Sequence, residues 1–222
     1  MLYLNSILSW INNQFVDKNI PKIIHQTAPA NTEDWHDIWF TCQKSWKRIY
    51  PNYSYVLWND ETMDTFMKNT YPEYYELYSN YPNKIMKIDA ARYFILYTYG
   101  GIYADMDYEV CRDFMHLVPQ NMVSVCESPY KENENCQNAL MISPKGHPFW
   151  KRVFKELVRS KNNNIIISVA GPKVIDRAMQ GRNDVHILPY QHFNPHKNGN
   201  EIQSDDRNIY TKHYGTFVWE NY

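Results

Sequence analysis

Residues 84–109 (KIMKIDAARYFILYTYGGIYADMDYE) constrain the fold most, because they join a helix, its end and a strand in one pattern. Apolar residues recur three and four positions apart over 85–99, which predicts a helix with one buried stripe. The stripe consists of Ile85, Ile88, Ala91, Ile95 and Tyr99. The glycine pair at 100–101 then ends the helix, since glycine adopts the left-handed C-cap conformation without a Cβ penalty. Residues 102–107 alternate in polarity and predict a buried strand.

Four charged side chains of this stretch stand where they can meet. Asp89 and Arg92 are three residues apart on the helix and share a face. Alternation along the strand places Asp105 and Asp107 on one face. Two neighbouring carboxylates are unfavourable unless a cation or a proton neutralises them. Hard divalent metals prefer oxygen ligands, so we expect a metal site at the end of this strand.

Each of these fragments also has a simpler interpretation. An isolated Asp-x-Asp occurs by chance in many proteins, and the pair of Asp89 and Arg92 can be an exposed salt bridge worth about 0.3–0.5 kcal/mol. The setting argues against both. Arg92 lies in an apolar run, AARYFILY, where a charge is not left unpaired.

Taken with other segments, these residues resemble the DxD sugar-binding glycosyltransferases of family 32, which include yeast-type α-mannosyltransferases and inositol-phosphoceramide mannosyltransferases. The matching segments are 20–27 (IPKIIHQT), 46–60 (WKRIYPNYSYVLWND) and 89–108, with weaker matches at 138–141, 171–172 and His213. The resemblance extends over nearly everything from residue 20 onward. It implies an α/β GT-A fold: one domain, 1–222, around a mostly parallel sheet, with the nucleotide at the carboxyl ends of the strands.

The resemblance also implies roles for individual residues. Asp107 would be a direct metal ligand, and Asp105 would contact the ribose and, through water, the metal. Asp89 and Arg92 would hold the donor sugar, and His213 would join the metal or the diphosphate. The metal would be manganese, with magnesium second.

Four earlier residues are implied to bind the nucleotide. His25 or Gln26 would contact it beyond the first strand, and the end of the second strand, Trp58 and Asp60, would contact base and ribose. For Asp60 the residues leave an alternative, because Asn59 and Asp60 can simply cap the next helix. A lone His is likewise more often structural than functional.

Two features depart from the family pattern. Many relatives carry an N-terminal membrane anchor, but polar residues interrupt the apolar ones of segment 1–15. It is too short and too polar for a signal peptide or a membrane span. We expect an amphipathic helical extension over 1–19 that packs on the domain, with a membrane-surface or partner-binding helix as the minority alternative, and a cytoplasmic protein. Second, Thr216 and Phe217 stand where relatives have Ser-Trp, and Trp219 is a candidate replacement for that aromatic.

Elsewhere the pattern predicts further elements of an α/β domain. They are strands at 21–26, 53–58, 122–126, 138–142 and 185–188, and helices at 34–50, 61–80 (one or two), 148–159 and after 171–172. A net charge of −1 over 222 residues provides no global field to recruit nucleic acid or an anionic membrane. Four cysteines without a C-x-x-C spacing suggest free thiols.

The function expected is metal-dependent, retaining transfer of a hexose from a UDP- or GDP-sugar to a hydroxyl of a glycan, lipid or protein. A glycoside hydrolase also uses paired carboxylates, but on opposite sides of the bond and about 5–9 Å apart. A carbohydrate-binding module would use the 19 tyrosines as a platform. Neither alternative explains why the four charged residues come as a set.

Overall fold

The computed structural model describes residues 19–216, except 131, 133, 164, 198–199 and 202–207. The predicted extension over 1–19, apart from Asn19, and positions 217–219 lie outside the described residues. Among the described helices, none has both the length and the apolar character needed to cross a bilayer.

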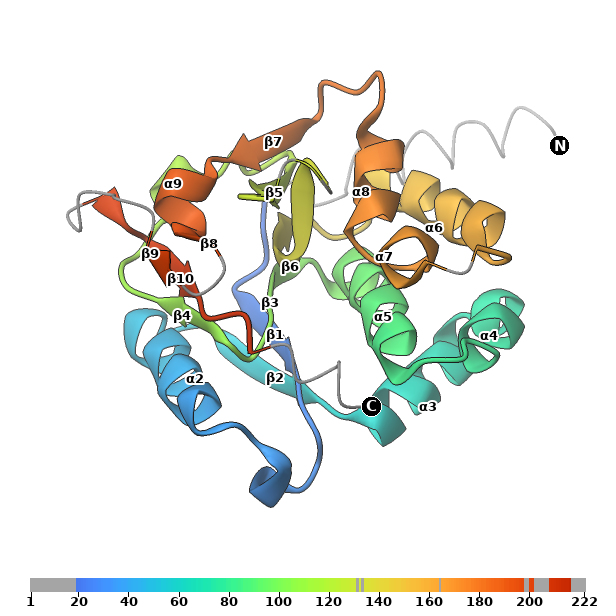
Figure 1. Cartoon of the computed structure of the whole chain (residues 1–222), viewed down its shortest axis with the longest axis horizontal. Helices are drawn as coiled ribbons and strands as arrows, with labels where there is room; N and C mark the ends of the chain where they lie inside the picture. The colour runs from blue at the N-terminus through green and yellow to red at the C-terminus, as the bar shows by residue number, and fades with distance from the viewer. Residues whose placement is uncertain are drawn as a thin grey trace, which may run out of the picture.

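A six-stranded sheet in the order β2-β1-β3-β6-β5-β7 forms the centre of the molecule (Figure 1). Strand β6 runs antiparallel to both of its neighbours, and the other neighbouring pairs are parallel. The expected mostly parallel sheet is therefore confirmed. Its strands are β1 (Ile23–Thr27), β2 (Ser54–Trp58), β3 (Gly101–Ala104), β5 (Val123–Glu127), β6 (Cys136–Ser143) and β7 (Val185–Leu188).

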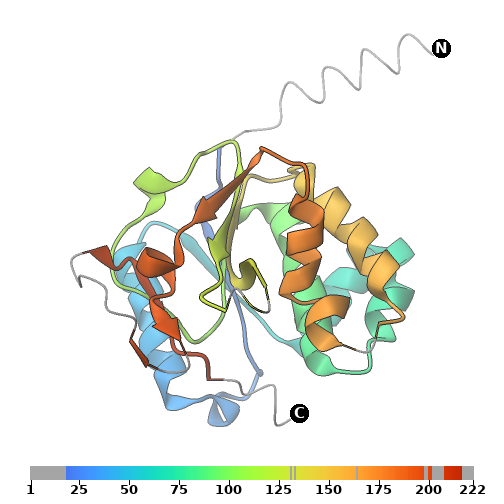
Figure 2. The same ribbon diagram turned by 45° about the horizontal axis from the view of Figure 1, so that its top comes forward.

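Helices cover both faces of this sheet (Figures 1 and 2). One face carries α3 (Asp60–Thr70), α4 (Pro72–Ser79), α5 (Lys84–Tyr99), α6 (Phe149–Ser160), α7 (Ile166–Val169) and α8 (Pro172–Met179). The other face carries α2 (Asp37–Ile49), α9 (Tyr190–Phe193) and the antiparallel pair of β4 (Tyr108–Val110) with β10 (Thr211–His213). Short 3-10 turns η1 (Thr32–Asp34) and η2 (Met115–Leu117) and the pair β8 (His196–Lys197) and β9 (Asn200–Glu201) complete the described elements.

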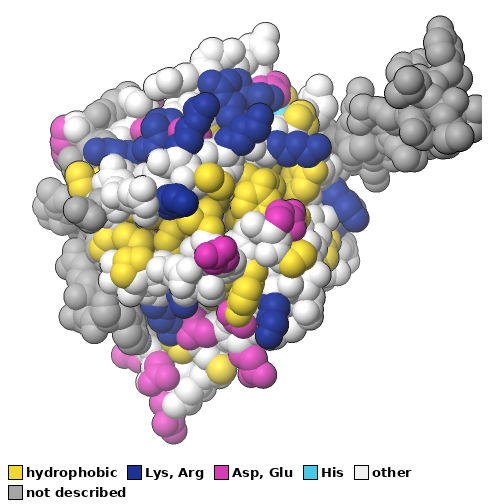
Figure 3. Space-filling view, turned by 90° about the vertical axis from the view of Figure 1, so that its right-hand side faces the viewer, with side chains coloured by type: hydrophobic (Ala, Val, Ile, Leu, Met, Phe, Trp, Pro, Cys, Tyr) yellow, Lys and Arg dark blue, Asp and Glu magenta, His cyan; other side chains and the backbone are white. Residues whose placement is uncertain are grey.

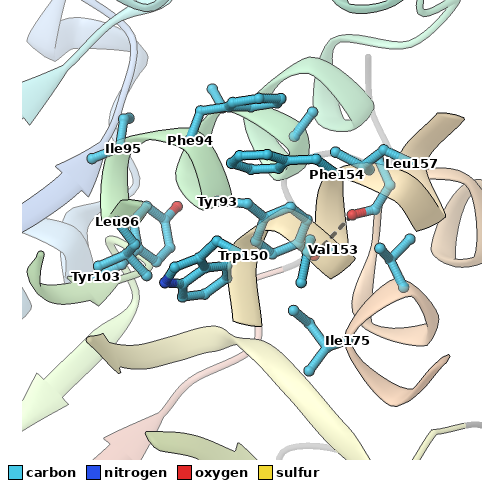
Figure 4. Close-up of a cluster of buried hydrophobic side chains, with 14 of the residues drawn as sticks. Tyr93, Phe94, Ile95, Leu96, Tyr103, Trp150, Val153, Phe154, Leu157 and Ile175 are labelled. Atoms are coloured by element: carbon cyan, nitrogen blue, oxygen red, sulfur yellow. Dashed lines mark hydrogen bonds between the residues drawn. The ribbon is translucent and has the colours of Figure 1, made fainter. Parts of the chain in front are cut away.

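Helix α5 is buried on all sides along its middle, which corrects the prediction of a single stripe. Every residue from 89 to 96 is buried, including both charged ones. Figure 4 shows the reason: Phe94 stacks on Phe154 of α6 at a ring-centroid distance of 4.0 Å, while Tyr93 stacks on Trp150. This part of the helix therefore has no solvent-exposed face, whereas Tyr99, placed on the predicted stripe, is 37% exposed.

The glycine pair sets the start of β3. Gly100 has φ +66° and caps α5, as predicted. Gly101 has φ +93°, and a Cβ there would lie 2.4 Å from the carbonyl oxygen of Ile23 in β1. Only glycine therefore allows α5 to end and β3 to begin directly beside β1.

Strand β3 is shorter than predicted. It ends at Ala104, and a turn closed by the bond from the Tyr108 amide to the Asp105 carbonyl follows. The predicted strand over 102–107 was wrong for Asp105 and Asp107, because the chain leaves the sheet here to form β4. The turn nevertheless lies at the carboxyl ends of β1 and β3, where ligands bind in open α/β sheets.

Candidate active site

A cavity of about 600 Å³ opens at this edge of the sheet. Its polar wall includes all five residues predicted to serve metal and sugar, together with an asparagine of β6: Asp89, Arg92, Asp105, Asp107, His213 and Asn138. Its apolar wall comes from α3, α5 and α7 and includes Met63, Ile85, Ile88, Ile166 and Ile167. Residues far apart in the sequence thus meet in one cavity.

Arg92 is the hub of the polar wall, although it is only 2% exposed. Its guanidinium reaches Oδ1 of Asp89 at 3.0 Å and Oδ1 of Asp105 at 3.1 Å. It also donates to the carbonyl of Asn138 at 3.0 Å and lies 4.6 Å from the ring centroid of Tyr103. The interpretation of Asp89 and Arg92 as an exposed salt bridge was therefore wrong. The pair is buried, as the apolar sequence around Arg92 indicated.

Asp89 accepts a hydrogen bond from a neutral donor as well as from Arg92. The Asn138 side-chain amide donates to Oδ1 of Asp89 at 2.8 Å and to the Tyr93 hydroxyl at 3.0 Å. Burial raises the pKa of Asp89 to about 6, against the opposing effect of Arg92. Asp89 is thus held in position through Oδ1, and none of the described residues hydrogen-bonds its second oxygen, Oδ2, which can therefore take a ligand.

The two aspartates of the DxD turn are held by different neighbours. Asp105 accepts a hydrogen bond from the Tyr103 hydroxyl at 2.8 Å, and Tyr103 is bonded in turn to Thr27 of β1. Asp107 accepts from both the amide and the hydroxyl of Thr216, at 2.8 and 3.0 Å. Strands β3 and β1 therefore orient the first carboxylate, and the segment after β10 orients the second.

His213 completes the cluster. Its Nε2 lies 3.2 Å from Oδ1 of Asp107, and its ring stacks on Tyr108. Burial alone would raise the pKa of Asp107, but His213 and Thr216 together hold it well below its usual range. Conversely, Asp107 raises the pKa of His213 against the effect of burial.

These three residues fit a divalent metal. One ligand atom from each of Asp105, Asp107 and His213 lies within 4.8 Å of the others. Two carboxylate oxygens and an imidazole nitrogen suit manganese or magnesium. Since a metal ligand must be deprotonated, the same acidic surroundings that attract a proton to His213 would attract the metal instead.

His25, Gln26 and Trp58 are placed differently from the nucleotide contact predicted for them, because none of them lines the cavity. Trp58 Nε1 can only donate, so Nδ1 of His25 accepts at 3.2 Å and Nε2 donates to the Gly100 carbonyl at 3.0 Å. Burial lowers the pKa of His25 to about 4 and keeps it neutral. Gln26 donates to the backbone carbonyl of Asp105 at 3.0 Å. These side chains brace the site from behind, and β1 reaches the cavity through Thr27.

Asp60 does line the cavity, at the first turn of α3. The helix is capped by Asn59, which forms a capping box with Thr62. Capping therefore does not account for Asp60. Its carboxylate pairs with Lys84 at 2.7 Å across the cavity wall and is 59% exposed. It remains a candidate for a ribose or base contact.

Three site residues were not singled out as functional from the sequence. Asn138 belonged to a segment that matched the family, which was a usable signal. Thr216, which the sequence resemblance placed where a serine is expected, donates to Asp107 through its amide and its hydroxyl. Glu134 had no signal: it lies in the connection between β5 and β6, lines the cavity, and burial raises its pKa to about 7.

Comparison with known proteins agrees with this geometry. Residues 36–124 match the family described as "glycosyltransferase sugar-binding region containing DXD motif". The chain carries a glycosyltransferase sugar-binding region. This match includes Asp89, Arg92 and the DxD turn of that region. The resemblance drawn from the sequence is confirmed.

Two relatives with similar sequences each match about two thirds of this chain. Inositol phosphoceramide mannosyltransferase 3 of Schizosaccharomyces pombe is 41% identical over 140 residues, 63% of this chain and 38% of the relative. Mannosyl phosphorylinositol ceramide synthase CSH1 of Saccharomyces cerevisiae is 38% identical over 144 residues, 65% of this chain and 37% of the relative. The matches thus span well under half the length of either relative.

Solved glycosyltransferase structures share the fold. The UDP-bound glycosyltransferase domain of the YGT toxin superposes with a TM-score of 0.54 at 10% sequence identity, over 78% of this chain and 80% of that domain. The GT-A fold inferred from the sequence is therefore confirmed.

Proposed function

We propose that this chain is a single-domain, metal-dependent, retaining glycosyltransferase that transfers a hexose from a nucleoside-diphosphate sugar to an acceptor hydroxyl. One observation carries the proposal: the triad of Asp105, Asp107 and His213 shares a cavity wall with the buried pair of Asp89 and Arg92. The first group suits a metal-bound diphosphate, and the second suits a sugar. The names of the relatives make mannose the first sugar to test and an inositol phosphoceramide the first acceptor.

Each group of residues has a task in such a transfer. Asp105, Asp107 and His213 would hold the metal, which when bound supplies positive charge to the leaving diphosphate. Asp89 offers Oδ2 to the hydroxyls of the donor sugar, because Arg92 and Asn138 occupy Oδ1. Arg92 Nε is buried without a hydrogen-bond partner among the described residues. A buried donor is costly to leave unpaired, and an oxygen of the donor sugar would provide the missing partner.

Retention at the anomeric carbon follows two possible routes. Double displacement needs a carboxylate below the sugar as nucleophile. Asp89 is assigned to the hydroxyls of the donor sugar, and Glu134 is a further carboxyl group that the structure adds to the cavity. We favour front-face attack, in which the departing diphosphate takes the acceptor's proton. On this route Glu134→Gln keeps measurable turnover and the product keeps the α configuration.

A thermal-shift screen of UDP-, GDP- and CDP-sugars, with and without manganese, tests the donor and the metal. A ligand at 100 times its dissociation constant adds about 2.7 kcal/mol of stability. We expect one sugar nucleotide to stabilise the protein, only with metal, and EDTA to reverse the effect. If free oligosaccharides stabilise the protein, and neither EDTA nor nucleotide changes that stabilisation, the result would point to a carbohydrate-binding module.

Proton NMR of the first product formed tests the stereochemistry. An α-linked product from an α-linked donor supports retention. A β-anomeric coupling would show inversion and would reject the proposed mechanism. Loss of all turnover in a folded Glu134→Gln variant that still binds donor would replace front-face attack by double displacement through Glu134.

A further inference from the structure

The outer face of α6 concentrates positive charge in a nearly neutral chain. Segment 145–161 contains six Lys and Arg and one acidic residue, so its formal charge is +5 and the rest of the chain, at a total of −1, carries −6. Its basic residues are Lys145, Lys151, Arg152, Lys155, Arg159 and Lys161. Five of the six are exposed, and Arg152 is half-buried.

The one acidic residue of the segment points inward. Glu156 is 7% exposed and pairs with Arg159 at 2.7 Å and with Arg177 of α8 at 3.3 Å. It therefore leaves the outer face of α6 without a carboxylate of its own. Figure 3 shows Lys and Arg gathered on the side of the molecule that carries α6 and α4, above a band of apolar side chains.

Exposed aliphatic side chains adjoin these cations. Val158, on the outer face of α6, is 45% exposed, and Ile165, just before α7, is 57% exposed. A surface that combines basic side chains with exposed aliphatic ones suits the boundary of an anionic membrane. A nucleic acid would use the cations but gains little from Val158 or Ile165.

Hydrogen bonds link this face to the wall of the cavity. The residues after Ile165, Ile166 and Ile167, line its apolar wall. The Ser160 hydroxyl, at the end of α6, donates to the Val169 carbonyl of α7 at 2.7 Å. The guanidinium of Arg177, which holds Glu156, also donates to the Ser168 carbonyl at 2.8 Å. The cationic face and the apolar wall of the cavity are therefore connected through α6, α7 and α8.

We propose that the outer face of α6, with Ile165, docks on an anionic phospholipid surface and so presents the cavity to a lipid acceptor in that surface. This inference rests on the proposed function and narrows its acceptor to one embedded in a membrane. The local charge overcomes the neutral total because electrostatic attraction to a surface falls off within about a Debye length.

Co-sedimentation of the full chain with vesicles tests the docking without donor or acceptor. Vesicles of phosphatidylcholine alone are compared with vesicles that also contain phosphatidylserine. We expect binding to the anionic vesicles only, weakened by salt. Each basic residue near such a surface contributes about 1 kcal/mol, or about fivefold in partitioning. The variant Lys151→Gln/Arg152→Gln/Lys155→Gln should therefore bind about 100-fold more weakly.

A matched control carries the same change of charge elsewhere. Lys44→Gln/Arg48→Gln/Lys68→Gln alters exposed cations of α2 and α3 and should bind like the wild type. Equal losses in the two triple variants, or no loss in the α6 variant, would overturn the proposal. Ile165→Ser should weaken vesicle binding several-fold. If the protein instead binds soluble heparin as tightly as vesicles, and Ile165→Ser leaves the affinity for heparin unchanged, the partner is a soluble polyanion and not a membrane. Nucleotide-sugar binding, measured separately by thermal shift, should be unchanged in the α6 variant, so failure of docking and failure of the proposed enzyme are distinguishable.

Discussion

Replacing Arg92 by alanine tests the hub of the polar wall. The substitution removes the charged partner of Asp89 and one of the partners of Asp105, and it leaves the Asn138 carbonyl without its donor. Asp89 is 6% exposed, so solvent stabilises the unpaired carboxylate less well than the guanidinium did. Removing one partner of a buried ion pair typically costs about 3–5 kcal/mol. For a chain of this size that corresponds to a fall in melting temperature of about 6 to 20 °C.

Urea unfolding followed by circular dichroism measures this cost, and a second variant shows where it comes from. In Arg92→Ala/Asp89→Asn the uncompensated charge at position 89 is also gone, while the side-chain volume at that position is kept. If the cost arises from a buried, unpaired carboxylate, the double variant should recover roughly 1–3 kcal/mol relative to Arg92→Ala. A single variant within about 1 kcal/mol of the wild type, with no recovery in the double variant, would refute the structural role and assign Arg92 to the donor alone.

Three further predictions concern the metal ligands, Glu134 and the glycine junction between α5 and β3. Asp107→Asn should abolish manganese-dependent nucleotide binding, because it removes a ligand charge and the partner of His213; isothermal titration that gives wild-type affinity would contradict the metal assignment. Glu134→Gln removes a carboxyl group whose pKa burial raises from 4.5 to about 7. The neutral form of Glu134 stabilises the wild-type protein below about pH 4.5, and this contribution, at most about 3 kcal/mol, is lost as the pH rises to 7. The free energy of unfolding of the variant, measured in urea across this range, should therefore depend less on pH than that of the wild type. Parallel curves for the two proteins would refute this. Gly101→Ala should cost several kcal/mol because it adds a clash to a strained φ, whereas Gly146→Ala, also at positive φ but in open space, should cost only the strain; equal melting temperatures in the two variants would argue against a tight junction.

The strands and most helices were predictable because their signals are local. Runs such as 185–188 and 53–58 combine β-branched and aromatic residues between turn residues, and both form strands within a residue of the prediction. The one or two short helices predicted over 61–80 are two, α3 and α4. The burial of α5 was not predictable in this way. Its all-round enclosure depends on Phe154 and Trp150, which lie more than fifty residues later and carry no mark of where they pack.

In the candidate site, too, the features that depend on local spacing were predictable and those that depend on tertiary packing were not. Asp105 and Asp107 were placed together correctly, although through a strand that the structure replaces with a turn, because spacing alone brings them close. His25 illustrates the opposite case. The sequence places it at the exit of β1, but only the positions of Trp58 and Gly100 show that both ring nitrogens are already used. Glu134 has no periodic or motif context, and tertiary packing alone brings it to the cavity.

The anchors of the DxD turn bear on how much of the chain a minimal active unit must contain. Thr27, Asn138, His213 and Thr216, which fix the carboxylates or stand beside them, all lie outside the matched region 36–124. A peptide trimmed to that region would keep the Asp-x-Asp motif but lose the residues that orient its carboxylates. Two proteins can therefore share the motif and differ in competence, and the parts worth transplanting into another scaffold are spread over about 190 residues, from Thr27 to Thr216.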